Sequence, residues 1–240
     1  MIFVSSWDDG HPLDMRIAEL LAKYGLQGTF YVPGRNCESR SVMTADVIRQ
    51  LSEHFEIASH TLDHKYLDRL SSREIDRQIR DGKSALEGIL CAPVNGFCYP
   101  GGRHNTYITR AVQQAGFHNA RTIENLRLDS GIDRYKVPTT VQFFPHRRAT
   151  ILRNFARRGH FIGRAPALIK LCASSNWTEA MFGLLRYCAA TDGVFHLWGH
   201  SWELEEQRLW RHLESLLSAI AECKPVSLTV SELAATIESV

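Results

Sequence analysis

Short apolar runs alternate with amphipathic stretches over the first half of the chain, and this alternation constrains the fold more than any other feature. Four runs predict strands that end in polar residues: MIFVSSW, GTFYVP, FEIASH and GFCYPGG. Apolar residues at helical spacing predict helices over 13–24, over 44–53 with Thr44 as N-cap, over 73–90 and over 106–115. This β-α-β-α order predicts an α/β protein with a mostly parallel sheet, whose active site lies at the strand ends.

The length and composition favour one soluble folding unit. With 240 residues, 44% of them hydrophobic, and neither repeat nor linker, we expect a single domain over residues 1–240. The net charge of +2 gives no general case for nucleic-acid binding. Neither a secretory signal nor a transmembrane run is recognisable, and the six cysteines form no CxxC pair. We therefore expect reduced thiols and a cytoplasmic location.

A basic segment interrupts the pattern in the second half of the chain. Residues 146–170 hold seven lysine and arginine residues and no acidic residue. The simplest interpretation is an amphipathic helix with Ile151, Leu152 and Phe155 on one side and a solvated cationic face. The alternative is that Arg153, Arg157 and Arg158 bind an anionic substrate group, such as a nucleotide diphosphate or lipid pyrophosphate, or touch an anionic membrane surface.

Two polar pairs follow predicted strands. Asp8 and Asp9 could form a turn or helix cap, or one carboxylate could bind a metal while the other acts as a base. His60 and His64 are four residues apart, so a helical turn would bring both imidazoles to one face, as metal ligands or as ordinary surface or core residues. Asp63 is expected to orient this segment, with metal ligation as the alternative.

Two further clusters lie later in the chain. GVFHLWGH predicts the last clear core strand, with His196, Trp198 and His200 on one face; His196 alone could equally be a hydrogen-bonded core residue. A helix over 203–223 and then one more strand and helix are expected to follow. FCYPGGRHN predicts a glycine-rich turn whose amides can approach a ligand closely.

In this order, SWDDG, SHTLDH, FCYPGG and LWGH resemble the motifs of the polysaccharide deacetylase family, the carbohydrate esterases with a NodB-homology domain. The resemblance covers residues 1–120 and 190–205 and is poor between them, so residues 146–190 are expected to form a family-atypical insertion. It implies a single distorted (β/α) barrel and a divalent metal, zinc first, with nickel, cobalt or iron as alternatives.

The resemblance also implies roles for individual residues. Asp9, His60 and His64 would hold the metal, Asp8 would be the catalytic base and His200 the catalytic acid. The amide of Gly101 would help to hold the oxyanion. The residues assigned to the substrate site are Tyr99, Gly101, Gly102, His196 and Trp198.

Three departures from the family pattern concern the support of these residues. Cys98 stands where the family carries an arginine directed at the catalytic aspartate, and Gly101 stands where an aromatic residue is usual. The aspartate and the tryptophan of the family's fourth motif have no convincing match, and Asp129 is the nearest candidate for the aspartate.

Three functions fit these observations. The first is metal-dependent removal of an N-acetyl group from an amino sugar, in an intracellular precursor of a surface polysaccharide or O-antigen that is nucleotide- or lipid-linked. The second is hydrolysis of a cyclic amide or imide by an allantoinase-like relative. The third is a non-catalytic carbohydrate-binding or metal-binding module.

Overall fold

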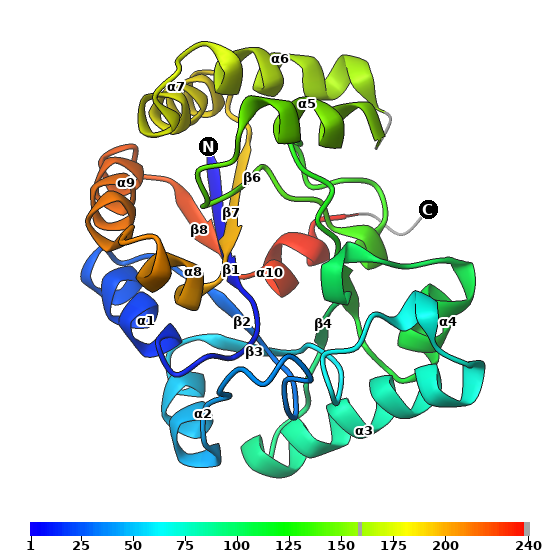
Figure 1. Ribbon diagram of the computed structural model, residues 1–240. Helices are drawn as coiled ribbons and strands as arrows, with labels where there is room; N and C mark the ends of the chain where they lie inside the picture. The colour runs from blue at the N-terminus through cyan, green and yellow to red at the C-terminus, as the bar shows by residue number, and fades with distance from the viewer. Residues whose placement is uncertain (158–159, 238–240) are drawn as a thin grey trace.

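The computed structural model describes residues 1–157 and 160–237 and shows a parallel sheet curled into a distorted barrel with helices around it (Figure 1). The sheet order is β5-β4-β3-β2-β1-β7-β6, with β8 paired to β1. The strands are β1 (Ile2–Trp7), β2 (Thr29–Val32), β3 (Glu56–Ser59), β4 (Gly96–Cys98), β5 (Asn119–Arg121), β6 (Val141–Gln142), β7 (Val194–Gly199) and β8 (Val226–Leu228).

The segment 137–142 closes the barrel between β5 and β7. The N–H of Val137 donates to Ala120 at 2.9 Å, and that of Thr140 donates to His196 at 2.9 Å. Only two residues of this segment form a strand, although VPTTVQFF has a strand-like composition. The predicted barrel is therefore confirmed, and irregular backbone completes its wall.

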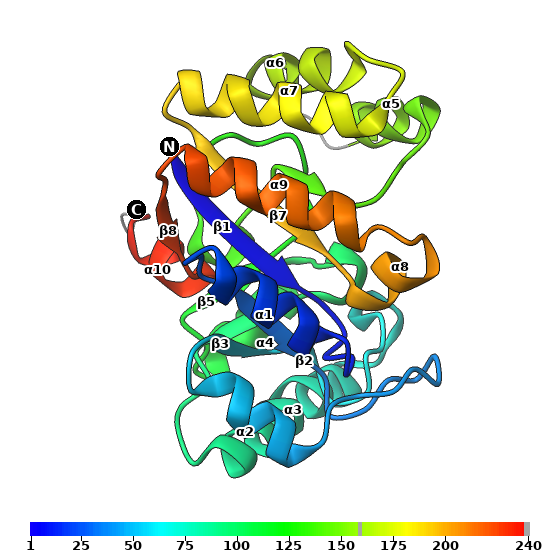
Figure 2. The ribbon, with the colours of Figure 1, turned by 90° about the vertical axis from the view of Figure 1, so that its left-hand side faces the viewer.

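The helices surround the sheet, apart from α10 (Val230–Ala235), which lies at the centre of the ring of strands in Figure 1 (Figures 1 and 2). They are α1 (Asp14–Lys23), α2 (Ala45–Ser52), α3 (Ser72–Leu90), α4 (Thr106–Gln114), α5 (Arg148–Arg157), α6 (Phe161–Cys172), α7 (Trp177–Ala190), α8 (Ser201–Glu206), α9 (Trp210–Glu222) and α10 (Val230–Ala235), with 3₁₀ turns η1 (Leu67–Arg69), η2 (Pro100–Gly102) and η3 (Arg134–Lys136). Among the described residues, none of these helices has the length and apolar character needed to cross a membrane.

Sequence patterns located most helix ends to within a residue or two. Thr44 caps α2 as expected, because its hydroxyl accepts the N–H of Val47. Helix α3 begins at Ser72, one residue before the expected start at 73, and Ser71 caps it where Ser72 was expected to do so. The expected helix over 203–223 is wrong as one element: it is broken between α8 and α9, where Arg208 has a positive φ of 55°.

Two apolar clusters hold the barrel together. The larger lies between the sheet and the outer helices and includes Phe3, Trp7 and Phe195. The smaller includes Val4 and Ala58 and is completed by α10, whose Val230 and Leu233 pack against these strand residues. Alternate residues of β1 thus belong to different clusters, which explains why the strand is apolar on both faces.

The basic segment forms α5 and most of α6, and α7 packs against α6 at the same edge of the molecule (Figures 1 and 2). The helix expected around Arg153 is confirmed as α5. Of its expected apolar side, Ile151 and Phe155 are partly buried, whereas Leu152 is 51% exposed. The remaining two helices were not predicted individually.

Candidate active site

Asp8 and Asp9 leave the end of β1 in different directions. The N–H of Asp8 donates to the carbonyl of Gly199 at 3.0 Å, so the β1–β7 pairing continues one step and brings Asp8 level with His200. Asp9 has a positive φ of 79°. Both carboxylates are almost wholly buried. This backbone turn is what lets two adjacent carboxylates take different partners.

A tight turn after β3 brings His60 and His64 together, with ring centroids 4.9 Å apart. The expected helical turn is wrong: Thr61 and His64 have positive φ values of 69° and 55°, and no helix forms there. The side chain of Asp63 points into a different network, where it accepts hydrogen bonds from Arg35 Nε at 2.7 Å and Gln78 Nε2 at 2.7 Å. Asp63 therefore fixes the turn, as expected.

Asp9, His60 and His64 form a cluster with the composition and geometry of a metal site. Asp9 Oδ1 lies 3.1 Å from His64 Nε2 and 3.9 Å from His60 Nε2. This oxygen is buried and accepts no hydrogen bond from any described residue. The other carboxylate oxygen accepts from Trp202 Nε1 at 2.9 Å, and His60 Nδ1 contacts the carbonyl of Cys98 at 2.9 Å. These outer contacts orient the carboxylate and the imidazole, as the second shell of a metal site does. The residues therefore fit a divalent cation.

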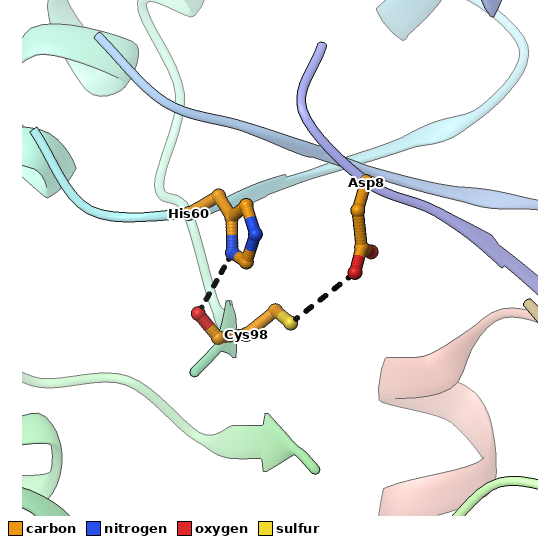
Figure 3. Close-up of side chains that lie close together, drawn as sticks. All are labelled: Asp8, His60 and Cys98. Carbon is orange, nitrogen blue, oxygen red and sulfur yellow. Dashed lines mark hydrogen bonds between the residues drawn. The ribbon is translucent and has the colours of Figure 1, made fainter. Parts of the chain in front are cut away.

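A second cluster, of Asp8, His60 and Cys98, lies beside the first (Figure 3). The Cys98 thiol points toward Asp8, with Sγ 3.9 Å from Oδ2, while its carbonyl faces His60. The guanidinium of Arg121 contacts both Asp8 and Cys98 Sγ, the latter at 2.9 Å. A fixed positive charge at this position opposes a second cation, so the Asp9 cluster is the better metal site.

Arg121 supplies the guanidinium that Cys98 lacks. The two residues are register partners on the adjacent parallel strands β4 and β5. Arg121 Nη2 lies 2.5 Å from each carboxylate oxygen of Asp8, and the guanidinium lies 5.0 Å from the ring centre of Tyr31 and 5.1 Å from that of Trp198. Burial alone would raise the pKa of Asp8, but Arg121 holds it below its usual value. Arg121 thus occupies, from the adjacent strand, the place beside Asp8 that the resemblance predicts for an arginine.

His200 follows β7 and is oriented by Glu203 from the first turn of α8. Its Nδ1 lies 2.7 Å from Glu203 Oε2. Burial would lower the pKa of His200, but the hydrogen bond to Glu203 and the charge of Asp9 raise it to about 9. Asp129, the nearest candidate for the aspartate of the fourth motif, pairs with Arg127 and is half exposed. The carboxylate that orients the histidine is that of Glu203.

Several residues assigned to the substrate site have other contacts. Tyr99 is fully buried and donates its hydroxyl to the carbonyl of Tyr135 at 3.0 Å. His196 is 1% exposed, with Nε2 2.9 Å from the Ser6 hydroxyl and Nδ1 2.8 Å from the carbonyl of Pro138. Both ring nitrogens are occupied within the protein, so the geometry gives His196 the core role that was its alternative interpretation.

Gly101 and Gly102 form the η2 turn with positive φ values of 61° and 64°. A Cβ on Gly101 would lie 2.7 Å from the ring of Tyr66, and one on Gly102 would lie 2.4 Å from the side chain of Ile123. The conformation and the close approaches together require glycine at both positions. Trp198 lies beside the site, with its ring centre 5.6 Å from that of His200.

The arginines considered as anion contacts lie on or beyond α5. Arg153 is exposed, Arg157 belongs to the helix, and Arg158 lies outside the described residues. None of the ligands in the Asp9 cluster contacts α5 through a described hydrogen bond or ion pair. The structure thus leaves their role as a prediction.

Sequence reasoning missed three functional neighbours: Arg121, Trp202 and Glu203. Glu203 lies three residues after His200, a spacing that allows side-chain contact on a helix and could have identified it. Arg121 ends a three-residue strand in a stretch without clear periodicity, so only the register of β4 and β5 reveals it.

Comparison with known proteins places these features in a family. The polysaccharide deacetylase family model matches residues 2–120. A peptidoglycan-N-acetylglucosamine deacetylase from Bacillus cereus is 27% identical over 118 residues, which cover 48% of this chain and 54% of that protein. The chain spans about half the length of the curated relatives it matches.

Solved structures extend the similarity of fold over nearly the whole chain. A Mycobacterium smegmatis structure assigned to the polysaccharide deacetylases is 16% identical, covers 98% of this chain and 90% of its own, and has a TM-score of 0.68. A family 4 acetyl xylan esterase from Clostridium thermocellum, in complex with a cobalt ion, is 16% identical and has a TM-score of 0.60. The match covers 97% of this chain and 90% of the esterase chain. With its family match over residues 2–120 and this barrel fold, the chain belongs to the polysaccharide deacetylase family.

Proposed function

We propose that this protein is a metal-dependent hydrolase that removes an N-acetyl group from an amino sugar. The observation that carries the proposal is the placement of Asp8. This carboxylate is buried and paired with Arg121, stands next to the Asp9 cluster in the chain, and is level with His200 on the neighbouring strand. A base, an acid and a cation site thus converge at the ends of β1, β3 and β7.

Asp8 would act as the general base. The charge of Arg121 keeps its carboxylate ionised, so it can accept a proton from the water that attacks the carbonyl carbon of the acetyl group. The guanidinium of Arg121 lies within cation–π distance of the rings of Tyr31 and Trp198, which help to hold the pair in place. Asp8 is therefore the residue that activates the nucleophile.

His200 would act as the general acid. The hydrogen bond to Glu203 raises the pKa of His200, which favours the protonated imidazole, and it fixes the ring through Nδ1. The opposite nitrogen, Nε2, is then the one that protonates the departing amine as the C–N bond breaks. The products are acetate and the free amino sugar.

Asp9, His60 and His64 would hold the divalent cation. The mixed carboxylate and imidazole ligands suit zinc first, with nickel, cobalt or iron as alternatives. When bound, the cation supplies Lewis-acid polarisation of the acetyl carbonyl. The amide of Gly101 on the η2 turn is a candidate second donor to the developing oxyanion.

The substrate is proposed to be an N-acetylated amino sugar of a polysaccharide or its precursor, on a nucleotide or lipid carrier. The name of the Bacillus cereus relative, a peptidoglycan-N-acetylglucosamine deacetylase, supports the amino-sugar part. All six cysteines lie among the described residues as free thiols, which supports action in a reducing compartment such as the cytoplasm.

The test is acetate release by the metal-loaded protein from chitooligosaccharides, nucleotide-linked N-acetyl sugars and lipid-linked N-acetyl sugars. Asp8→Asn should retain the metal and lose activity, while Asp129→Asn, at a half-exposed carboxylate, should match the wild type. Absence of acetate release from all three classes with metal bound would refute the proposal. Ring opening of hydantoins or allantoin, without acetate release from sugars, would indicate a cyclic amide hydrolase. Sugar binding that is equal in the wild type and Asp8→Asn, with no turnover by either of them, would indicate a binding module.

A further inference from the structure

Helix α6 is apolar on two opposite faces, and the protein covers only one of them. Arg164 and Ala167 are fully buried, with Leu168 and Leu171 packed against the main core. The guanidinium of Arg164 anchors this face, because its Nε donates to the carbonyl of Asn125 at 2.8 Å and Nη1 donates to that of Phe155 at 3.1 Å. The orientation of the helix is therefore fixed.

The opposite face of α6 exposes large apolar side chains. Ile162 is 93% exposed and Ile169 is 65% exposed; seven residues apart, they lie on the same side of the helix. Leu152, on the neighbouring helix α5, is 51% exposed. We call these three residues the apolar patch. An isolated exposed isoleucine is ordinary, but three on adjacent helices mark a surface that contacts something apolar.

Exposed arginines accompany the apolar patch, whereas Asp129, which lines a pocket with Ile162, is paired with Arg127. Arg147 and Arg148 at the start of α5, and Arg153 beside Leu152, are exposed and form no ion pair among the described residues. The chain contains no aspartate or glutamate between residues 146 and 178. The three arginines thus give this edge a positive charge without local compensation.

We propose that the α5–α6 edge docks on an anionic lipid bilayer, with the apolar patch in the headgroup region and the arginines against lipid phosphates. Exposed apolar residues with adjacent cations are the combination that binds such a surface. The charge selects this occupant over a second copy of the chain, because pairing two identical edges would bring the arginines of both together. Both ribbon views place α6 at the outer edge of the molecule, where a flat surface can reach it (Figures 1 and 2).

The proposal is tested by co-sedimentation of the full chain with vesicles of phosphatidylcholine alone and of phosphatidylcholine mixed with phosphatidylglycerol. One variant removes the apolar patch on α6, Ile162→Ser with Ile169→Ser. A second removes charge, Arg147→Ser with Arg153→Ser. The matched controls are Val226→Ser, at a 60% exposed valine of β8, and Arg80→Ser, at an exposed arginine of α3.

The wild type and both controls should sediment with the anionic vesicles only, and added salt should release them. Each arginine near an anionic surface contributes about fivefold to the affinity, or about 1 kcal/mol, so the charge variant should bind about 25-fold more weakly. The apolar variant should lose at least about tenfold. No sedimentation, equal binding to neutral vesicles, or unchanged binding by both variants would overturn the proposal. The proposal would also be overturned if the wild type were a dimer, and if Ile162→Ser with Ile169→Ser converted it to a monomer without affecting vesicle binding.

Discussion

The substitution Arg121→Met removes the guanidinium beside Asp8 and keeps a long apolar side chain. Arg121 is fully buried and Asp8 is 4% exposed, so solvent screens their attraction very little. Removing one member of a buried ion pair costs about 3 to 5 kcal/mol of unfolding free energy, because the Asp8 carboxyl is left buried without its partner and must take up a proton to lose its charge. Denaturant unfolding should therefore show a loss of this size.

The same substitution should lower kcat by about 100- to 10,000-fold, the usual contribution of a general base, because an unpaired buried carboxyl takes up a proton. KM should change much less, since Arg121 lies behind Asp8 and supports it. The assay is steady-state acetate release from an N-acetylated sugar, with metal content measured in the same samples.

Moving the arginine from position 121 to position 98 distinguishes a loss of Asp8 orientation from a general loss of protein stability. Because Cys98 and Arg121 are register partners, Cys98→Arg combined with Arg121→Cys returns the guanidinium to the strand used in the family pattern. The double variant should recover a substantial part of kcat relative to Arg121→Met. A folded, metal-loaded Arg121→Met protein with wild-type kcat would refute the reasoning.

Three further predictions concern the support of the site. Glu203→Gln should lower the pKa of His200 from about 9, so the alkaline limb of the profile of kcat against pH should move to lower pH. The stability that the charged His200–Glu203 pair contributes, which is fully present below pH about 6.5, should also be reduced. Trp202→Phe should weaken metal affinity about 10- to 100-fold in a chelator competition, because it removes the hydrogen bond to Asp9 Oδ2. Gly102→Ala should cost about 1 to 3 kcal/mol of unfolding free energy through steric overlap, in addition to backbone strain.

Each of these predictions has a matched control. Glu206→Gln changes an exposed glutamate of the same helix and should leave the pH profile in place. Trp210→Phe removes an indole that donates to Glu205 and should leave metal affinity unchanged. Gly25→Ala has a similar positive φ of 65° but meets nothing within 4 Å, so it should cost only the strain. Equal effects of a variant and its control would contradict the corresponding explanation.

The periodicity of the first 115 residues was enough to predict a mostly parallel α/β sheet and the polar ends of its strands, whereas the barrel was implied by the family resemblance. Asp8, Asp9, His60 and His64 could be grouped because each pair directly follows a strand, and parallel strands end at one edge. The geometry within each of these residue pairs could not be predicted from the sequence. The two histidines meet through positive φ angles that no helical pattern encodes.

Relocated side chains could not be predicted from motif spacing. Cys98 predicted an unsupported Asp8, yet Arg121 lies directly opposite it across a strand pair of only three residues. Such a substitution is visible only when the register is known. In the same way, Glu203 reaches His200 because a short helix begins at Ser201, where a longer helix over 203–223 was expected.

The most direct test of the central claim is a crystal structure of the metal-loaded protein, with the ion located by anomalous scattering. The ion should lie within about 2.0 to 2.2 Å of a ligand atom from each of Asp9, His60 and His64, with Asp8 still paired to Arg121. An ion bound by Asp8, His60 and Cys98, with Arg121 displaced, would contradict the account, because Asp8 would then be a ligand and no longer available as the base.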